Sequence, residues 1–131
     1  MLFHIYYSSI IALPKPPSNC TLKPAFSHVD ICFQLPKEEV ESATEYKIMY
    51  WPTDKTDNVT TLYVNKSEFK CPYKISHLED DTSYTFKVAV ANKIAFGADS
   101  AVFSAKTNRA SKYLDSGQLI SLQVYLAFII E

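Results

Sequence analysis

Several features that would point to a particular chemistry are scarce or missing in this sequence. The 131-residue chain has a net charge of −1 and no stripe of lysine and arginine, so it offers no surface that would neutralise the phosphates of nucleic acid. Glycine is scarce, with two residues against nine tyrosines and eight phenylalanines, a ratio that favours aromatic-rich strands. Because 47% of the residues are hydrophobic and only 21% are charged, the composition excludes a disordered tail.

Catalytic and metal-binding motifs are also missing. The histidines His4, His28 and His77 are dispersed, and the sequence has no Gly-x-Ser-x-Gly motif, no His-Glu-x-x-His motif and no phosphate-binding loop. The acidic turn at residues 79–81 lacks the spacing of oxygen ligands found in dedicated calcium loops. We therefore expect a protein that is not an enzyme and that has no cofactor and no metal site.

Cysteines and glycosylation motifs bear on the cellular compartment. The chain contains three cysteines, an odd number, so at least one thiol is unpaired within it. It also contains three sequons, the Asn-x-Ser or Asn-x-Thr acceptors of N-linked glycans, at Asn19, Asn58 and Asn65. About one sequon is expected by chance in a chain of this composition. The excess favours an extracellular or cell-surface location over a cytosolic one.

The two ends of the chain differ in composition from the part between them. Residues 1–13 are apolar and aromatic and contain no lysine or arginine. They fit either a partial signal-like segment or a gene-model fragment, since a signal peptide needs a basic first region. Residues 108–131 comprise a polar linker and an apolar run at 119–130. This run is shorter than the about 20 residues of a membrane helix, so a truncated membrane anchor, a translated intron and a helix packed on the domain are the alternatives.

Between these ends, the pattern of apolar residues predicts strands. From residue 84 to residue 90 every second residue is aromatic or β-branched, the period of a strand with one buried face. Tyr84 opens this strand after a polar turn, where a tyrosine can bury its ring and hydrogen-bond its hydroxyl to nearby backbone. Similar runs at eight-to-twelve-residue spacing favour an antiparallel sandwich of seven strands. The expected strands span residues 20–22, 28–35, 46–52, 60–64, 69–75, 84–90 and 101–106.

Residues 14–107 resemble a fibronectin type III domain. The family opens with prolines and a small turn, matched by Pro16-Pro17-Ser18-Asn19, and its third strand has a Tyr-x-hydrophobic-x-Tyr pattern, matched by residues 46–50. Its strongest signature is matched by a run of ten positions. These are Leu78, Thr82, Tyr84, Phe86, Val88, Val90, Asn92, Gly97, Ser100 and Thr107.

The resemblance implies an all-β, immunoglobulin-like Greek-key sandwich of seven strands. Three departures mark the chain as a divergent member: Phe33 stands where the family usually has Trp, Ala95 where a loop glycine is common, and Asp81 where Pro-Gly often forms the turn. The expected structural core and corner residues are Phe33, Tyr46, Ile48, Leu78, Tyr84, Phe86 and Val88.

The phase of the strands leads to a prediction for the cysteines. Cys20 follows an asparagine expected to point outward, so Cys20 should point inward. Cys71 lies two positions before the inward Tyr73 and should share its direction, whereas Cys32 alternates with inward residues and should face out. In such a sandwich the second strand lies between the first and the fifth, so Cys20 and Cys71 would be about 9–10 Å apart. A disulfide needs Cα atoms within about 7 Å. We therefore expect Cys20 and Cys71 to be small buried hydrophobes, with a Cys20–Cys71 bridge as the alternative.

The loop at residues 92–99 is the expected site of partner binding. Integrin-binding members of the family use Arg-Gly-Asp in this loop, and this chain has no such sequence. The candidate partner-binding residues are instead Lys93, Ile94, Phe96 and Asp99, because apolar residues at an exposed loop tip can form the centre of a contact. The alternative is that Ile94 and Phe96 fold back over the end of the sandwich.

The resemblance and the sequons together predict the function. We expect a non-catalytic, extracellular module of a cell-surface receptor or adhesion protein, which spaces neighbouring domains of a larger parent and binds a protein partner. The alternatives are an ectodomain fragment of a receptor tyrosine phosphatase or kinase whose catalytic part is absent here, and an intracellular scaffold module. A cytokine-receptor module is disfavoured because no Trp-Ser-x-Trp-Ser stretch precedes the last strand.

Overall fold

Seven strands form in residues 12–110, the part of the chain that the computed structural model describes. A short 3₁₀ helix, η1, follows the second strand and contains Glu38 and Glu39. The elements are β1 (Ser18–Pro24), β2 (Val29–Gln34), η1 (Lys37–Glu39), β3 (Glu45–Pro52), β4 (Thr60–Asn65), β5 (Tyr73–Ile75), β6 (Ser83–Ala91) and β7 (Phe103–Lys106).

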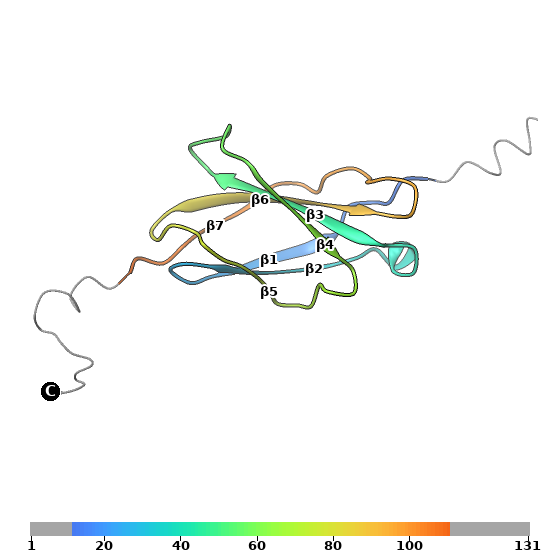
Figure 1. Cartoon of the computed structure of the whole chain (residues 1–131), viewed down its shortest axis with the longest axis horizontal. Helices are drawn as coiled ribbons and strands as arrows, with labels where there is room; N and C mark the ends of the chain where they lie inside the picture. Colours follow the sequence, from blue (N-terminus) through green and yellow to red (C-terminus); the bar gives the residue numbers. More distant parts are fainter. Residues whose placement is uncertain (1–11, 111–131) are drawn as a thin grey trace, which may run out of the picture.

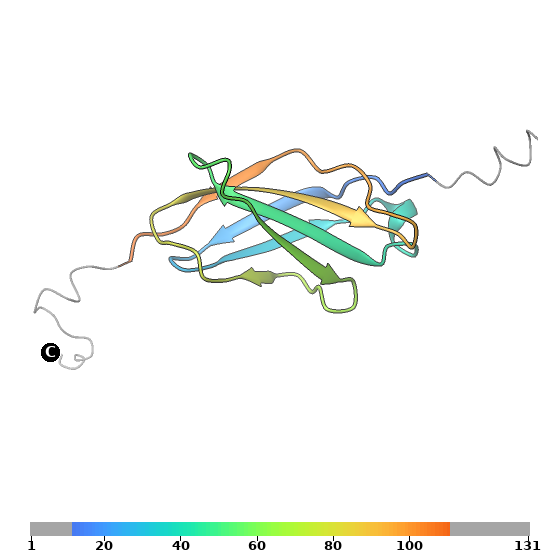
Figure 2. The same ribbon diagram turned by 45° about the horizontal axis from the view of Figure 1, so that its top comes forward.

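The strands pair into two antiparallel sheets that pack face to face (Figure 1). One sheet has the order β1-β2-β5 and the other β4-β3-β6-β7. Figure 2 shows the same two layers after a turn about the long axis. The prediction of a seven-stranded antiparallel sandwich is confirmed.

The core lies between the sheets and is built from the inward residues of each strand. Val29 and Ile31 on β2 and Phe86 and Val88 on β6 are completely buried, as the period of two requires. The seven residues expected in the core and at the corner are all buried there. Phe33, in the position usually held by Trp, packs edge-on against Tyr46 with 5.2 Å between ring centroids and lies 4.5 Å from the ring of Phe69.

A tyrosine corner ties the turn before β6 to the strand. The backbone N–H of Glu79 donates a hydrogen bond to the hydroxyl oxygen of Tyr84 at 2.9 Å. The hydroxyl of Thr107 lies beside this bond, where it donates to the carbonyl of Glu79 at 2.6 Å and accepts from the N–H of Thr82 at 3.0 Å. Side chains thus satisfy backbone groups at a turn where no ladder continues.

Apart from the exposed Ser83 and the half-buried Lys87, strand β6 is buried on both faces, whereas its pattern predicts one buried face. Thr85, Ala89 and Ala91 point away from the core, yet their exposed fractions are only 7%, 0% and 3%. The causes are the central position of β6 in its sheet and the small size of these three side chains. β6 is hydrogen-bonded to β3 on one side and β7 on the other, so its small outward side chains lie beneath longer neighbours.

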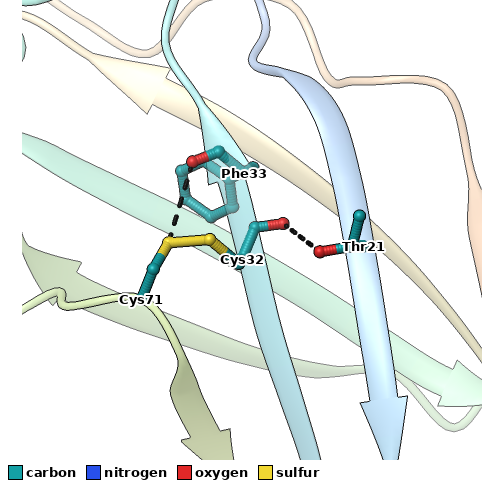
Figure 3. The surroundings of a disulfide bond; sticks show 4 residues. All are labelled: Thr21, Cys32, Phe33 and Cys71. Carbon is teal, nitrogen blue, oxygen red and sulfur yellow. Dashed lines mark hydrogen bonds between the residues drawn. A yellow bond between two sulfur atoms is a disulfide. The ribbon is translucent and has the colours of Figure 1, made fainter.

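The prediction for Cys20 is confirmed in part, because Cys20 is unpaired and packs half-buried against the core, whereas the prediction that Cys71 is inward and unpaired is wrong. Cys32 and Cys71 form a disulfide with 5.0 Å between their Cα atoms, and Cys20 is the free cysteine. As Figure 3 shows, the bridge links β2 to the segment before β5, and the Cys71 sulfur lies 3.9 Å from the carbonyl oxygen of Phe33.

The error came from assuming that the alternation of inward and outward side chains in β5 continues back from Tyr73 to Cys71. β5 begins only at Tyr73, because Pro72 has no N–H with which to continue a ladder. Cys71 is therefore exposed rather than inward. β2 does lie between β1 and β5, which separates Cys20 from Cys71 and also makes Cys32 the neighbour of the β5 segment.

Most of the two terminal segments lies outside the described residues. The proposals for residues 1–13, as a signal-like or gene-model fragment, and for the 119–130 apolar run therefore concern segments that the structure largely leaves out. Within residues 12–110, no helix has the length and apolar character needed to cross a membrane. The blue and orange ends of the described chain lie at opposite ends of the long axis (Figure 1).

A thiol count distinguishes the observed bridge from the sequence-based expectation. Without reductant, the denatured chain should expose a single alkylatable thiol, and after reduction it should expose three. In the native state Cys20 should react slowly, because burial raises its pKa and the thiolate is the reactive form. Replacing both Cys32 and Cys71 by Ala should lower the free energy of unfolding by about 2–4 kcal/mol, measured by denaturant titration. Three reactive thiols before reduction would contradict the bridge.

Removing the Tyr84 hydroxyl should weaken the corner. Tyr84→Phe deletes the acceptor of the Glu79 N–H, so the free energy of unfolding should fall by about 1–2 kcal/mol. Tyr63→Phe is the matched control, because Tyr63 is 63% exposed and the change should stay within about 0.5 kcal/mol. Equal effects of the two substitutions in urea unfolding would argue against the corner.

Candidate interaction site

The β6–β7 loop begins with a turn that Asn92 holds in place. The side-chain oxygen of Asn92 accepts hydrogen bonds from the N–H groups of Ile94 at 2.8 Å and Ala95 at 3.0 Å. The Asn92 N–H in turn donates to the carbonyl of Ala95 at 3.1 Å. Asparagine commonly closes turns in this way, so the loop tip has a defined shape.

The far side of this loop packs against the leading segment of the domain. The N–H of Gly97 donates to the carbonyl of Val90 at 2.9 Å, and a Cβ at position 97 would lie 1.8 Å from the carbonyl oxygen of Pro14. The Asn92 amide also donates to the carbonyl of Ala12 at 3.4 Å. In Figure 1 the yellow-to-orange loop accordingly lies beside the blue segment. Only glycine allows so close an approach.

Two of the four candidate binding residues lie at the loop tip. Lys93 and Ile94 are exposed, Ile94 at 58%. They border a hollow of about 370 Å³ between this loop and the segment before β3. The hollow is lined by Glu41, Ser42, Thr44, Asn92, Lys93 and Ile94. An exposed aliphatic side chain bordered by one acidic and one basic residue combines an apolar centre with a polar rim, the composition common at protein interfaces.

The other two candidates fold back onto the sheet. Phe96 bridges to Ala91, and its ring centroid lies 5.8 Å from that of Tyr63 with the Lys47 ammonium 5.1 Å from the Phe96 ring. Asp99 forms an ion pair with Lys87 at 3.0 Å. Ile94 thus takes the exposed position expected for a loop tip, and Phe96 takes the alternative position against the sandwich. Their roles in binding stay predictions.

The sheet face that receives Phe96 carries further large side chains. We call the solvent side of β4, β3 and β6 the outer face. Lys47, Met49 and Trp51 lie on it from β3, Tyr63 from β4 and Lys87 from β6, and Lys87 lies 6.0 Å from the Trp51 ring. Sequence reasoning missed Tyr63 as a site residue. The signal was available in the inward phase of Leu62 and Val64, which turns Tyr63 outward.

The three sequon asparagines are all exposed. Asn19 lies in β1 and its amide donates to the side-chain oxygen of Gln34 at 2.8 Å. Asn58 lies in the β3–β4 loop, and Asn65 is the last residue of β4. The hydroxyl residues that complete the three sequons are exposed as well: Thr21, Thr60 and Ser67.

A second hollow of about 380 Å³ lies beside Asn58, Tyr50 and Tyr84. His77 and Glu79 also border it. Within the described part of the chain, no group of three histidine, cysteine or acidic side chains is placed to hold a metal ion.

Comparison with known proteins identifies the fold. No protein-family model and no curated protein sequence matches the chain. Among solved structures, the third fibronectin III domain of human KIAA0343 matches with a TM-score of 0.67 and 22% identity over 79% of this chain and 90% of that one. The chain has the fibronectin type III fold. The fn3 domain of human contactin 1 is likewise similar, with a TM-score of 0.64 and 24% identity over 79% of this chain and 92% of that one.

A third structure with this fold contains several fibronectin domains. The FN1–FN3 domains of chicken CNTN1 match with a TM-score of 0.62 and 21% identity over 73% of this chain. This chain spans only 32% of that structure. At such identities the likeness concerns the fold alone, so a fibronectin type III domain is what the chain resembles in architecture, and its partners must be argued from its own surface.

Truncating the two apolar loop residues should separate their roles. Phe96→Ala removes the contacts with Tyr63 and Lys47, so it should lower the free energy of unfolding by about 1–2 kcal/mol. Ile94→Ala should change it by less than about 0.5 kcal/mol, because the side chain is mostly in solvent. Chemical unfolding of the two variants measures both values. A larger loss for Ile94→Ala would mean that the tip is packed.

Proposed function

We propose that this chain is a non-catalytic, extracellular fibronectin type III module of a cell-surface receptor or adhesion protein. It spaces neighbouring domains and binds a protein partner through the β6–β7 loop tip. The observation that carries the proposal is the Cys32–Cys71 disulfide. Disulfides form and persist in oxidising compartments and are rare in the cytosol, so the bridge favours the extracellular alternative over an intracellular scaffold.

The sequons support the same compartment. A glycan can be attached only where the asparagine is accessible, and all three acceptors are exposed on the folded domain. The inward positions of the sandwich contain no sequon asparagine. Three hydrophilic glycans could therefore be added without disturbing the core.

The shape of the domain supports a spacer role. The described chain enters at one end of the long axis and leaves at the other (Figure 2). Modules joined in this way extend in a row. The chicken CNTN1 structure contains three such domains in one chain. In a similar tandem arrangement, the length of this module would set the distance between its neighbours, and no catalytic group would be needed.

Partner binding is assigned to the loop tip for a physical reason. Ile94 combines high exposure with little role in packing, and Asn92 fixes the backbone beneath it. A preorganised apolar anchor loses little conformational entropy on binding. Phe96, which is similarly apolar, already packs on Tyr63 and is less available.

The compartment can be tested on the natural protein. An antibody raised against the folded domain should stain intact, non-permeabilised cells, and the detected protein should lose mass when its N-glycans are removed enzymatically. Both results follow from exposed sequons on an extracellular domain. Staining only after permeabilisation, with a mass unchanged by the enzyme, would overturn the extracellular assignment.

A further inference from the structure

We propose that the first sugar of an N-glycan on Asn65 packs against the ring of Tyr63, beside Phe96, so that the chain's own glycan covers this part of the outer face. The inference rests on the proposed extracellular function, because the glycan is added only in the secretory pathway. It identifies what lies over the most exposed aromatic side chain of the described residues, Tyr63 at 63%.

Strand β4 places the acceptor and the ring on the same face. Leu62 and Val64 point into the sandwich, whereas Tyr63 and Asn65 are both exposed. Alternate residues of a strand share a face. Two steps of about 3.3 Å each separate their Cα atoms, a distance that the asparagine side chain and one sugar ring can bridge.

The register of the sheet brings Phe96 to the same place. Tyr63 pairs with Lys47 and Asn65 pairs with Glu45, and Glu45 pairs on its other side with Ala91. Ala91 is bridged to Phe96, whose ring lies 5.8 Å from that of Tyr63. A sugar on Asn65 therefore emerges next to two aromatic rings.

The chemistry of the two surfaces is complementary. The face of an aromatic ring is electron-rich, and one side of a sugar ring presents a row of C–H groups that can approach it, as C–H groups do in other weak hydrogen bonds. The Lys47 ammonium lies over the Phe96 ring, which leaves Tyr63 as the more accessible surface. β4 is an edge strand, so no neighbouring strand obstructs the glycan on its open side.

The other two sequons provide controls within the same chain. The residue two positions before Asn58 is Thr56, and the one two positions before Asn19 is Pro17, which is buried. Neither is aromatic. The proposal therefore predicts an effect of the glycan at Asn65 that the glycan at Asn58 lacks.

A double-mutant cycle on the full chain, secreted from cultured cells behind a heterologous signal sequence, tests the contact. Ser67→Ala abolishes the Asn65 glycan while keeping the asparagine, and Tyr63→Thr removes the ring while keeping a strand-forming residue. Loss of the glycan should lower the folding equilibrium constant about tenfold, or about 1.4 kcal/mol, when Tyr63 is present. With Thr at position 63 the same loss should be less than about twofold.

Two further measurements sharpen the result. Trimming the glycan enzymatically to its single protein-linked sugar should preserve the stabilisation, because only the first sugar reaches the ring. Thr60→Ala, which removes the Asn58 glycan, should produce no effect that depends on Tyr63. In nuclear magnetic resonance spectra, protons of the Asn65-linked sugar should show ring-current shifts that disappear with Tyr63→Thr.

The outcomes separate this inference from the proposed function. A glycosylated Asn65 whose removal has the same effect with and without Tyr63 overturns the packing inference and leaves the extracellular assignment intact. An Asn65 without glycan, beside an occupied Asn58, also overturns only the packing inference. Absence of glycans from all three asparagines of the natural protein would overturn the packing inference, and together with staining only after permeabilisation it would also overturn the proposed function.

Discussion

The inward face of strand β6 is the constraint on which the rest of the structure depends. Phe86, Val88 and Val90 are completely buried against the opposite sheet, and β6 itself is paired on both sides, with β3 and with β7. Its start is fixed by the Tyr84 hydroxyl, which accepts the Glu79 N–H. This one strand therefore sets the register of its sheet and the position of the turn that precedes it. It also fixes the point at which the β6–β7 loop leaves the sheet.

The positions that hold the fold and the positions proposed for function are separate. The aromatic cluster around Phe33 and Phe69 lies between the sheets, whereas the sequons and the loop tip lie on surfaces that the core only positions. Such a division allows the outward residues to change without loss of the sandwich, since fold alone does not determine what a module binds. The family resemblance accordingly indicates an architecture, and the specific surface of this chain must indicate the partner.

The sequence predicted those features that depend on neighbouring residues. Alternation identified β2, β3 and β6 and their buried positions, and the polar turn before Tyr84 indicated the corner. Features that depend on pairing between distant segments were not predictable in this way. The side-chain direction assigned to Cys71 failed because β5 begins only after Pro72, and the bridge was missed because it joins Cys71 to Cys32, a residue 39 positions away on β2. Similarly, two alternatives for Phe96 stayed open because Tyr63, the residue that receives its ring, is 33 positions away.

The contact between Gly97 and Pro14 has a consequence for a module joined to others. The loop that carries Ile94 is in van der Waals contact with the segment through which the chain enters the domain, and the Asn92 amide adds a hydrogen bond to Ala12. A tilt of a preceding domain would therefore be transmitted directly to the loop. Conversely, a protein bound to the loop would stiffen this junction, so in a tandem arrangement the angle between domains would be mechanically coupled to the occupancy of the loop.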